Sequence, residues 1–354
     1  MRIIVHAKTE NKSKIELLVL SSPIFSDGSS IEFLSSSINN DTPWEYIIID
    51  EHHIDVVNNY ETDEISSKLY LLFFDSLVTA SNLEHINQAQ HMFYQKQDWG
   101  QVKRLNKIKI FFNRLLKREV LDTYPSRIQL ESTSVCNAQC IMCRHFYAGN
   151  HGAVDMDDRL ISKLKEVFPY IEVLIMHGNG EPFISRTFDA CIDIYSKYNI
   201  KLTTNTNLSV LTENQIDMIN QNFVSIQVSC DACTKEIYEG IRKNLSFDKF
   251  IANTARLRDM CPSVPKTLVC VVMRQNLQQI PEIVDFAVEY GFSEVVFADL
   301  GTNPLIGNEL DNVQTYPFVA AKQFRKCLQN GQKYQIKVTI PSDYDLTLEN
   351  EIEC

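Results

Sequence analysis

The stretch ESTSVCNAQCIMCRH, residues 131–145, decides the fold predicted for this 354-residue chain. It holds three of the ten cysteines in the spacing C-x3-C-x2-C, namely Cys136, Cys140 and Cys143. Iron–sulfur clusters are normally held by four thiolates. Three thiolates on one loop would therefore leave one iron open to a ligand, as catalytic metal sites require. The same thiolates with His145 or His151 would also suit a Cys3His zinc site.

Short apolar runs alternate with helical patterns from residue 126 to residue 342. Six runs are almost continuously apolar, which is typical of strands buried on both faces. They are Arg127–Ser132, Ile171–His177, Ile200–Asn205, Val224–Ser229, Thr267–Met273 and Glu294–Asp299. Helical patterns between them, such as Asp157–Val167 and Pro281–Tyr290, indicate parallel strands joined by crossovers. We therefore predict an α/β fold, a partial (β/α)6 barrel open on one side.

Four of these runs end in segments that suit ligand binding, because ligands collect at the carboxyl edge of parallel strands. MHGNGEP (176–182) has glycines that let a backbone approach a ligand closely. LTTNTNL (202–208) and SIQVSCDACTKEIYEGIRKN (225–244) bring polar side chains to the same edge, and CVVMRQN (270–276) brings apolar ones. Each segment also has a purely structural interpretation: a turn, a strand end, a solvated helix residue at Arg242, or a core position at Met273.

The cysteine spacing, Asn137 after the first cysteine and the order of the four segments resemble the radical S-adenosylmethionine (radical SAM) superfamily. The resemblance implies a [4Fe–4S] cluster on the three cysteines, with S-adenosylmethionine chelating the open iron. One electron then cleaves the sulfonium, and the resulting 5′-deoxyadenosyl radical abstracts a hydrogen atom from the substrate. The implied cofactor contacts are Gly178, Asn179, Gly180, Glu181, Asn205, Ser229, Asp231, Arg242 and Met273. Cys230 and Cys233 form a C-x-x-C without a partner pair, and we expect them to be structural.

The sequence divides into three predicted parts. Residues 1–120 are expected to form an α/β accessory domain, with strands near Ile15–Leu20, Tyr46–Ile49 and Tyr70–Phe74 and a basic helix over Gln101–Arg118. This part faintly resembles the second half of a class I methyltransferase without its glycine-rich loop. Residues 121–333 are expected to be the partial barrel. Residues 334–354 resemble the connector to a SPASM or twitch domain, in which Cys354 would be the first cluster ligand.

The charge balance limits the classes of partner. The formal net charge is −11 without a long basic run, which argues against nucleic acid and anionic membranes as partners. Without a secretory or membrane-spanning segment, a cytoplasmic protein is expected. The resemblance implies a reducing electron donor such as flavodoxin or ferredoxin, and a peptide, sugar or small-metabolite substrate. The alternative is a catalytically inactive or truncated binding protein with the same fold. The sequence names no catalytic acid, base or hydrogen donor.

Overall fold

The computed structural model describes residues 2–6, 30–33, 46–50, 69–73, 76–78, 83–115, 118–147, 152–302 and 306–347. The chain divides into two compact units. One comprises residues 1–126 with 169–171, and the other comprises residues 127–168 with 172–354. None of the described helices is long and apolar enough to cross a membrane. His151 and Cys354 lie outside the described residues.

The larger unit is built on a parallel seven-stranded sheet in the order β14-β13-β12-β10-β9-β8-β6. Its strands are β6 (Arg127–Gln129), β8 (Val173–Ile175), β9 (Lys201–Thr206), β10 (Phe223–Ser229), β12 (Lys266–Val272), β13 (Glu294–Asp299) and β14 (Lys337–Thr339). Six of them coincide with the predicted runs, which confirms the predicted α/β partial barrel. The seventh, β14, pairs with β13 and lies inside the segment that we expected to be a connector.

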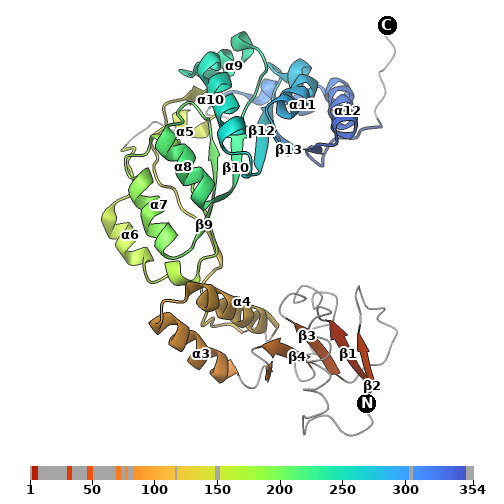
Figure 1. Cartoon of the computed structure of the whole chain (residues 1–354). Helices are drawn as coiled ribbons and strands as arrows, with labels where there is room; N and C mark the ends of the chain where they lie inside the picture. Colours follow the sequence, from red (N-terminus) through yellow and green to blue (C-terminus); the bar gives the residue numbers. More distant parts are fainter. Residues whose placement is uncertain are drawn as a thin grey trace. The chain divides into compact units, whose positions relative to one another are not determined.

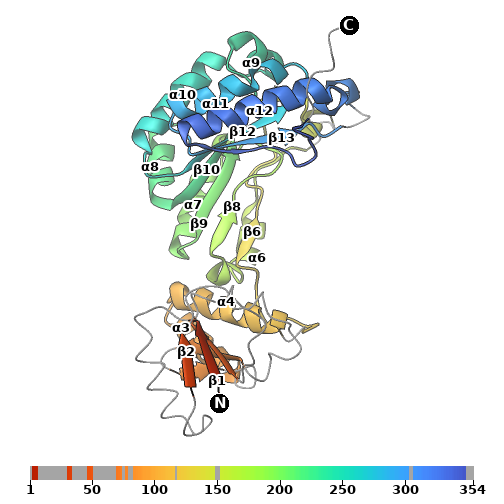
Figure 2. The same cartoon turned by 90° about the vertical axis from the view of Figure 1, so that its right-hand side faces the viewer.

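Helices cover one face of this curved sheet and leave the other open (Figures 1 and 2). The described helices of this unit are α5 (Arg144–Tyr147), α6 (Asp158–Leu164), α7 (Phe188–Lys197), α8 (Glu213–Asn222), α9 (Lys235–Ile241), α10 (Phe247–Met260), α11 (Ile280–Glu289) and α12 (Pro317–Tyr334). In β12, Leu268 and Cys270 are fully buried, whereas Thr267 and Val269, which point to the opposite face, are half-buried. The expectation of strands buried on both faces is therefore wrong for β12, because its second face lines the open side.

Local signals explain where the helices begin. Thr212 caps α8 through a reciprocal capping box with Gln215. Asp157 and Ser246 accept backbone N–H groups at the starts of α6 and α10. Pro281 lies in the first turn of α11, where its missing N–H costs nothing. These caps fix where each crossover turns back toward the next strand.

The smaller unit holds a second sheet in the order β2-β1-β3-β4-β5, parallel except for β5. Its strands are β1 (Arg2–His6), β2 (Ser30–Phe33), β3 (Tyr46–Asp50), β4 (Leu69–Phe73) and β5 (Ser76–Val78), and its helices are α3 (Leu83–Gln95) and α4 (Trp99–Leu115). The strands predicted near Tyr46 and Tyr70 and the helix predicted over 101–118 match β3, β4 and α4. The strand predicted over Ile15–Leu20 lies outside the described residues.

Polar residues of α4 hold the chain that leads out of this unit. Asn106 donates to the carbonyl of Tyr124 at 2.7 Å and accepts the N–H of Tyr124 at 3.1 Å. Lys109, although buried, donates to the carbonyl of Asp122 at 2.7 Å. These side chains satisfy backbone groups of an irregular segment, as buried backbone requires. The basic character of α4 is thus partly structural.

Candidate active site

A cavity of about 210 Å³ lies at the carboxyl ends of β8, β9 and β10. Its lining includes all three clustered cysteines together with six of the nine predicted cofactor contacts, Gly178, Gly180, Glu181, Asn205, Ser229 and Arg242. Its other lining residues are Ala138, His177, Thr206 and Asn207. The remaining predicted contacts, Asn179, Asp231 and Met273, are not among the described residues that line it. Segments almost 110 residues apart in sequence therefore meet in one pocket.

The turn after β8 fixes the loop that precedes Cys136. The N–H of Glu181 donates to the carbonyl of Val135 at 2.8 Å. Gly180 packs directly against this loop, since an added Cβ would overlap the carbonyl of Thr133 and lie 2.7 Å from that of Val135. A side chain at position 180 would push the cysteine loop away. Gly180 is therefore required for close packing of two backbones.

Glu131 holds the first half of the same turn. Its carboxylate accepts the N–H of Asn179, and a Cβ at Gly178 would overlap that carboxylate. The N–H of Asn179 is thus occupied by the chain itself. Sequence reasoning missed Glu131, whose only signal was its position directly after the first predicted strand.

The Glu181 carboxylate joins the ends of two strands. It is buried and accepts hydrogen bonds from the Thr206 hydroxyl at 2.6 Å and from the Asn207 N–H at 2.7 Å. It also accepts the N–H of Phe183 at 3.2 Å. Burial raises the pKa of this carboxyl, and the hydrogen bonds oppose that increase. Glu181 lines the pocket, but its carboxylate oxygens are used to tie the turn after β8 to the end of β9.

Cys140 lies on a short antiparallel ribbon. Its strand β7 (Gln139–Cys140) pairs with β11 (Arg242–Lys243), with Arg242 opposite Cys140. The N–H of Ile141 donates to the carbonyl of Ile241 at 3.0 Å, and the N–H of Cys143 donates to the carbonyl of Cys140 at 3.0 Å. The middle and last cysteines are therefore positioned by the segment that follows α9.

Arg242 is held by a buried ion pair. Its Nη2 lies 2.7 Å from Oδ2 of Asp231, with side-chain exposures of 7% and 0%. Asp231 also accepts the N–H of Val271 at 2.8 Å. Burial raises the pKa of the Asp231 carboxyl, and the guanidinium opposes that increase. The Arg242 Nε is buried and has no hydrogen-bond partner among the described residues. Asp231 is therefore placed to orient Arg242 rather than to face the pocket.

Met273 lies in the core, which was its structural alternative, whereas His177 lines the pocket without having been predicted there. Met273, 1% exposed, packs in a core cluster with Ile241 and Leu300 behind the cysteine loop. His177, which sequence reasoning overlooked directly before Gly178, lines the pocket. Its Nδ1 is buried without a hydrogen-bond partner in the part of the chain that the structure describes. Burial lowers its pKa, so His177 presents a neutral imidazole.

The donor set fits a cluster better than a single ion. Among the described residues, no group of three or more His, Cys, Asp or Glu side chains surrounds one metal position. A zinc site would place four ligands around one ion, with its thiolates about 2.3 Å from it. A [4Fe–4S] cluster instead takes each thiolate on a different iron. Cys136, Cys140 and Cys143 all line one pocket, which suits the second arrangement.

The thiols must lose protons when metal binds. Burial raises the pKa of Cys136, and it raises the pKa of Cys140 to about 11. Both are therefore thiols at neutral pH in the metal-free chain, and iron binding must displace their protons.

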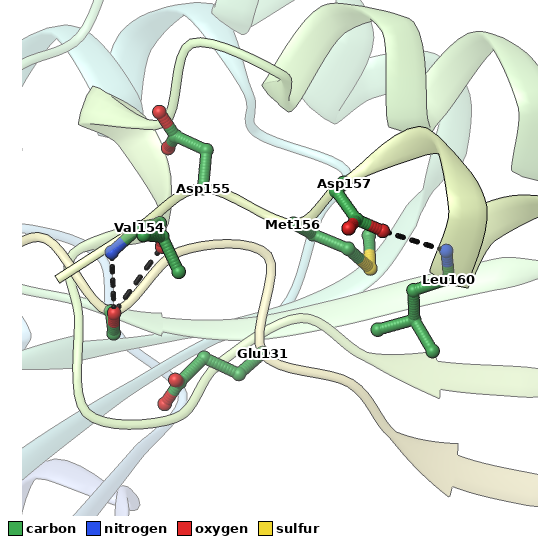
Figure 3. A pocket seen from close by; sticks show the side chains of 7 residues that line it. Glu131, Val154, Asp155, Met156, Asp157 and Leu160 are labelled. Atoms are coloured by element: carbon green, nitrogen blue, oxygen red, sulfur yellow. Dashed lines mark hydrogen bonds between the residues drawn. The ribbon is translucent and has the colours of Figure 1, made fainter. Parts of the chain in front are cut away.

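A second cavity, of about 460 Å³, lies beside this loop and is lined by Glu131, Ser134, Val154, Asp155, Met156, Asp157 and Leu160 (Figure 3). Its aspartates are occupied by the chain. Asp157 accepts the N–H of Leu160 at 2.8 Å, as Figure 3 shows, and Asp155 accepts the hydroxyl of Ser185 at 3.1 Å. These carboxylates therefore serve the local fold.

Comparison with known proteins agrees with this geometry. Residues 130–287 match the family model for the radical SAM superfamily. The chain is 26% identical over 221 residues to an uncharacterized protein of Methanocaldococcus jannaschii, a match that covers 59% of this chain and 72% of that one. It is 24% identical over 172 residues to the mycofactocin maturase MftC of Mycolicibacterium smegmatis, covering 47% of this chain but only 43% of the maturase.

Among solved structures, Streptococcus suis SuiB bound to its precursor peptide SuiA matches with a TM-score of 0.53 at 13% identity. That match covers 75% of this chain and 69% of SuiB, and it shows a shared fold. The family match shows that residues 130–287 form a domain of the radical SAM superfamily, whose enzymes use a [4Fe–4S] cluster and S-adenosylmethionine as cofactors.

Proposed function

We propose that the chain holds its cluster on Cys136, Cys140 and Cys143 and abstracts a hydrogen atom from a peptide substrate. The observation that carries the proposal is the single pocket that joins the three thiols to Asn205, Ser229 and Arg242. When bound, the cofactors supply reductive cleavage of S-adenosylmethionine and a 5′-deoxyadenosyl radical. The chain itself supplies binding and orientation.

Arg242 is the residue best suited to hold the methionyl carboxylate. One guanidinium nitrogen pairs with Asp231, which fixes the plane of the group. The planar fork of arginine leaves other N–H groups to donate to a carboxylate in a bidentate manner. The unpartnered Nε is consistent with such a ligand. Asn205 and Ser229 add neutral donors and acceptors on neighbouring strands.

The neighbours support a peptide as the substrate class. SuiB is solved with a precursor peptide, and MftC is named a maturase. A sugar or small metabolite is the alternative substrate class. The proposal also includes a cytoplasmic location and an electron donor of the flavodoxin or ferredoxin kind. Residues 1–120 are proposed to be an accessory domain, and residues 334–354 a connector toward a SPASM or twitch domain.

Anaerobic reconstitution tests the cluster and its ligands. Wild type, a Cys136→Ala/Cys140→Ala/Cys143→Ala variant and a Cys261→Ala control are compared; Cys261 is a buried thiol outside the pocket lining. Wild type and the control are expected to bind about four irons per chain and to release 5′-deoxyadenosine after dithionite reduction, while the triple variant does neither. Zinc in place of iron, or iron without cleavage, would favour the inactive binding protein.

The substrate class has its own test. Reconstituted enzyme is incubated with a deuterated cell extract, before and after the extract is digested with protease. Deuterium in 5′-deoxyadenosine reports a hydrogen atom taken from a molecule of the extract. A peptide substrate predicts that digestion abolishes the deuterium, whereas label that survives digestion would point to a sugar or metabolite.

A further inference from the structure

We infer that Asn137 is a positioning residue that fixes the direction of the Cys136 thiol. This inference rests on the proposed cluster site and adds to it a residue that does not line the pocket. The Asn137 side chain donates from Nδ2 to the hydroxyl of Ser209 at 2.8 Å. Its Oδ1 accepts from Nδ2 of Asn207 at 3.1 Å. Both partners belong to the segment that directly follows β9.

The network fixes the orientation of both amides. The Oδ1 of Asn207 accepts the N–H of Ser209 at 2.9 Å, so its Nδ2 must turn toward Asn137. That choice makes the Asn137 oxygen the acceptor and directs its Nδ2 toward Ser209. Asn207 is itself buried, and its N–H donates to the Glu181 carboxylate at 2.7 Å. Asn137 thus joins the cysteine loop to the same carboxylate that ties β8 to β9.

Cys136 therefore lies between two anchored neighbours. On one side the carbonyl of Val135 accepts the N–H of Glu181 at 2.8 Å. On the other side Asn137 is bound to Asn207 and Ser209. With about 3.8 Å between successive Cα atoms, anchoring both neighbours leaves the residue between them little freedom. The position of the Cys136 backbone is thus fixed by the hydrogen bonds of its two neighbours.

The position of Asn137 predicts a selective effect. Its side chain is exposed, and each of its two hydrogen bonds contributes only about 0.5–1.5 kcal/mol to net folding stability. Loss of the amide should therefore leave the fold intact and loosen one cluster ligand. If Asn137 had only a structural role, its replacement would lower the melting temperature without altering iron release or the spectrum of the cluster.

The test compares Asn137→Ala and Ser209→Ala with wild type and with Asn214→Ala. Asn214 is a matched control, because it is exposed and its Nδ2 donates to Asp189 at 2.8 Å on a neighbouring helix. After reconstitution, three quantities are measured: iron release to a chelator, the electron paramagnetic resonance spectrum of the reduced cluster, and thermal unfolding of the metal-free chain. Asn137→Ala is expected to release iron on the order of tenfold faster, the effect of one to two net hydrogen bonds, with an altered spectrum, whereas Asn214→Ala should change neither.

Ser209→Ala should accelerate iron release less, since Asn137 keeps its contact with Asn207. Asn214→Ala should behave as wild type. If wild type takes up no iron, the proposed function fails and this inference fails with it. If wild type loads normally and Asn137→Ala matches it in iron release and spectrum, the positioning role alone is overturned. Equal acceleration in Asn137→Ala and Asn214→Ala would overturn it too.

Discussion

Arg242 and Asp231 form a buried ion pair, 2.7 Å from Nη2 to Oδ2, and the backbone of Arg242 pairs with that of Cys140. The same arginine lines the pocket. The ion pair therefore connects the end of β10 to the β7–β11 ribbon that carries Cys140, and it holds one residue of the pocket lining in place. Removing either partner has different consequences, because one faces the pocket and the other does not.

Replacing Asp231 with alanine should destabilise the chain strongly. The change leaves the Arg242 charge buried without its counter-ion, which typically costs about 3–5 kcal/mol. Urea unfolding of the metal-free chain measures the effect. Asp248→Ala is the matched control, since the Lys235–Asp248 pair is exposed and pairs of that kind contribute about 0–1 kcal/mol. A loss below about 1 kcal/mol for Asp231→Ala would show that the pair is not the support inferred here.

Replacing Arg242 with lysine should distinguish its contribution to folding stability from its contribution to binding S-adenosylmethionine. Lysine keeps a positive charge near Asp231 but lacks the planar fork, so most of the stability should remain. Affinity for S-adenosylmethionine should fall about 10–100-fold, the effect of losing a hydrogen bond to a charged group. Calorimetric titration of the reconstituted enzyme measures it, with Lys243→Arg at the adjacent exposed position as the control. Unchanged affinity would remove Arg242 from the cofactor site.

Much of the fold was predictable from apolar runs, because buried strands and helix stripes are local patterns. The run Glu294–Asp299 matches β13 residue for residue. β14 was missed because Lys337–Thr339 is only three residues long, with half-buried Val338 between two exposed polar residues. Its place in the sheet depends on pairing with β13. Hydrogen bonds between residues far apart in the sequence could not be predicted either. Glu131 and Asn179 are 48 residues apart, and no local pattern joins them.

The sequence predicted which residues line the site better than it predicted what each side chain does there. Motif order placed six of the nine expected contacts in the pocket. The sequence did not reveal that the carboxylate of Asp231 turns toward Arg242, and it left open whether Met273 contacts the cofactor or lies in the core, where the structure places it. Those directions depend on which face of a strand end is covered by a neighbouring segment. Such information is tertiary and has no local signal.

Replacing Gly180 with alanine should displace the cysteine loop. The added Cβ would meet two backbone carbonyls, Thr133 and Val135, and backbone cannot give way as a flexible side chain does. The expected result is loss of most bound iron after reconstitution, measured by iron and sulfide analysis. Gly240→Ala is the control, because it lies in α9 with open space around its Cβ position. There alanine should stabilise the helix by about 0.5–1 kcal/mol. Normal iron content in Gly180→Ala would contradict the close packing inferred at this turn.

The buried thiol of Cys327 in α12 should make the metal-free chain less stable at alkaline pH. Burial raises its pKa from 9.0 to about 12, so the folded chain keeps a proton that the unfolded chain loses above pH 9. Because the unfolded state then binds fewer protons, stability falls as pH rises, by up to about 1.4 kcal/mol per pH unit for this group. The contribution is fully present below pH 9 and is lost progressively between pH 9 and about 12.

Urea unfolding of wild type and Cys327→Ala at pH 7, 8, 9 and 10, under reducing conditions, checks the effect. Alanine leaves a cavity, so the variant starts less stable, and the gap should stay constant from pH 7 to 8 and narrow by pH 10. A gap that is the same at all four values would mean that this thiol ionises as readily in the folded chain as in the unfolded one.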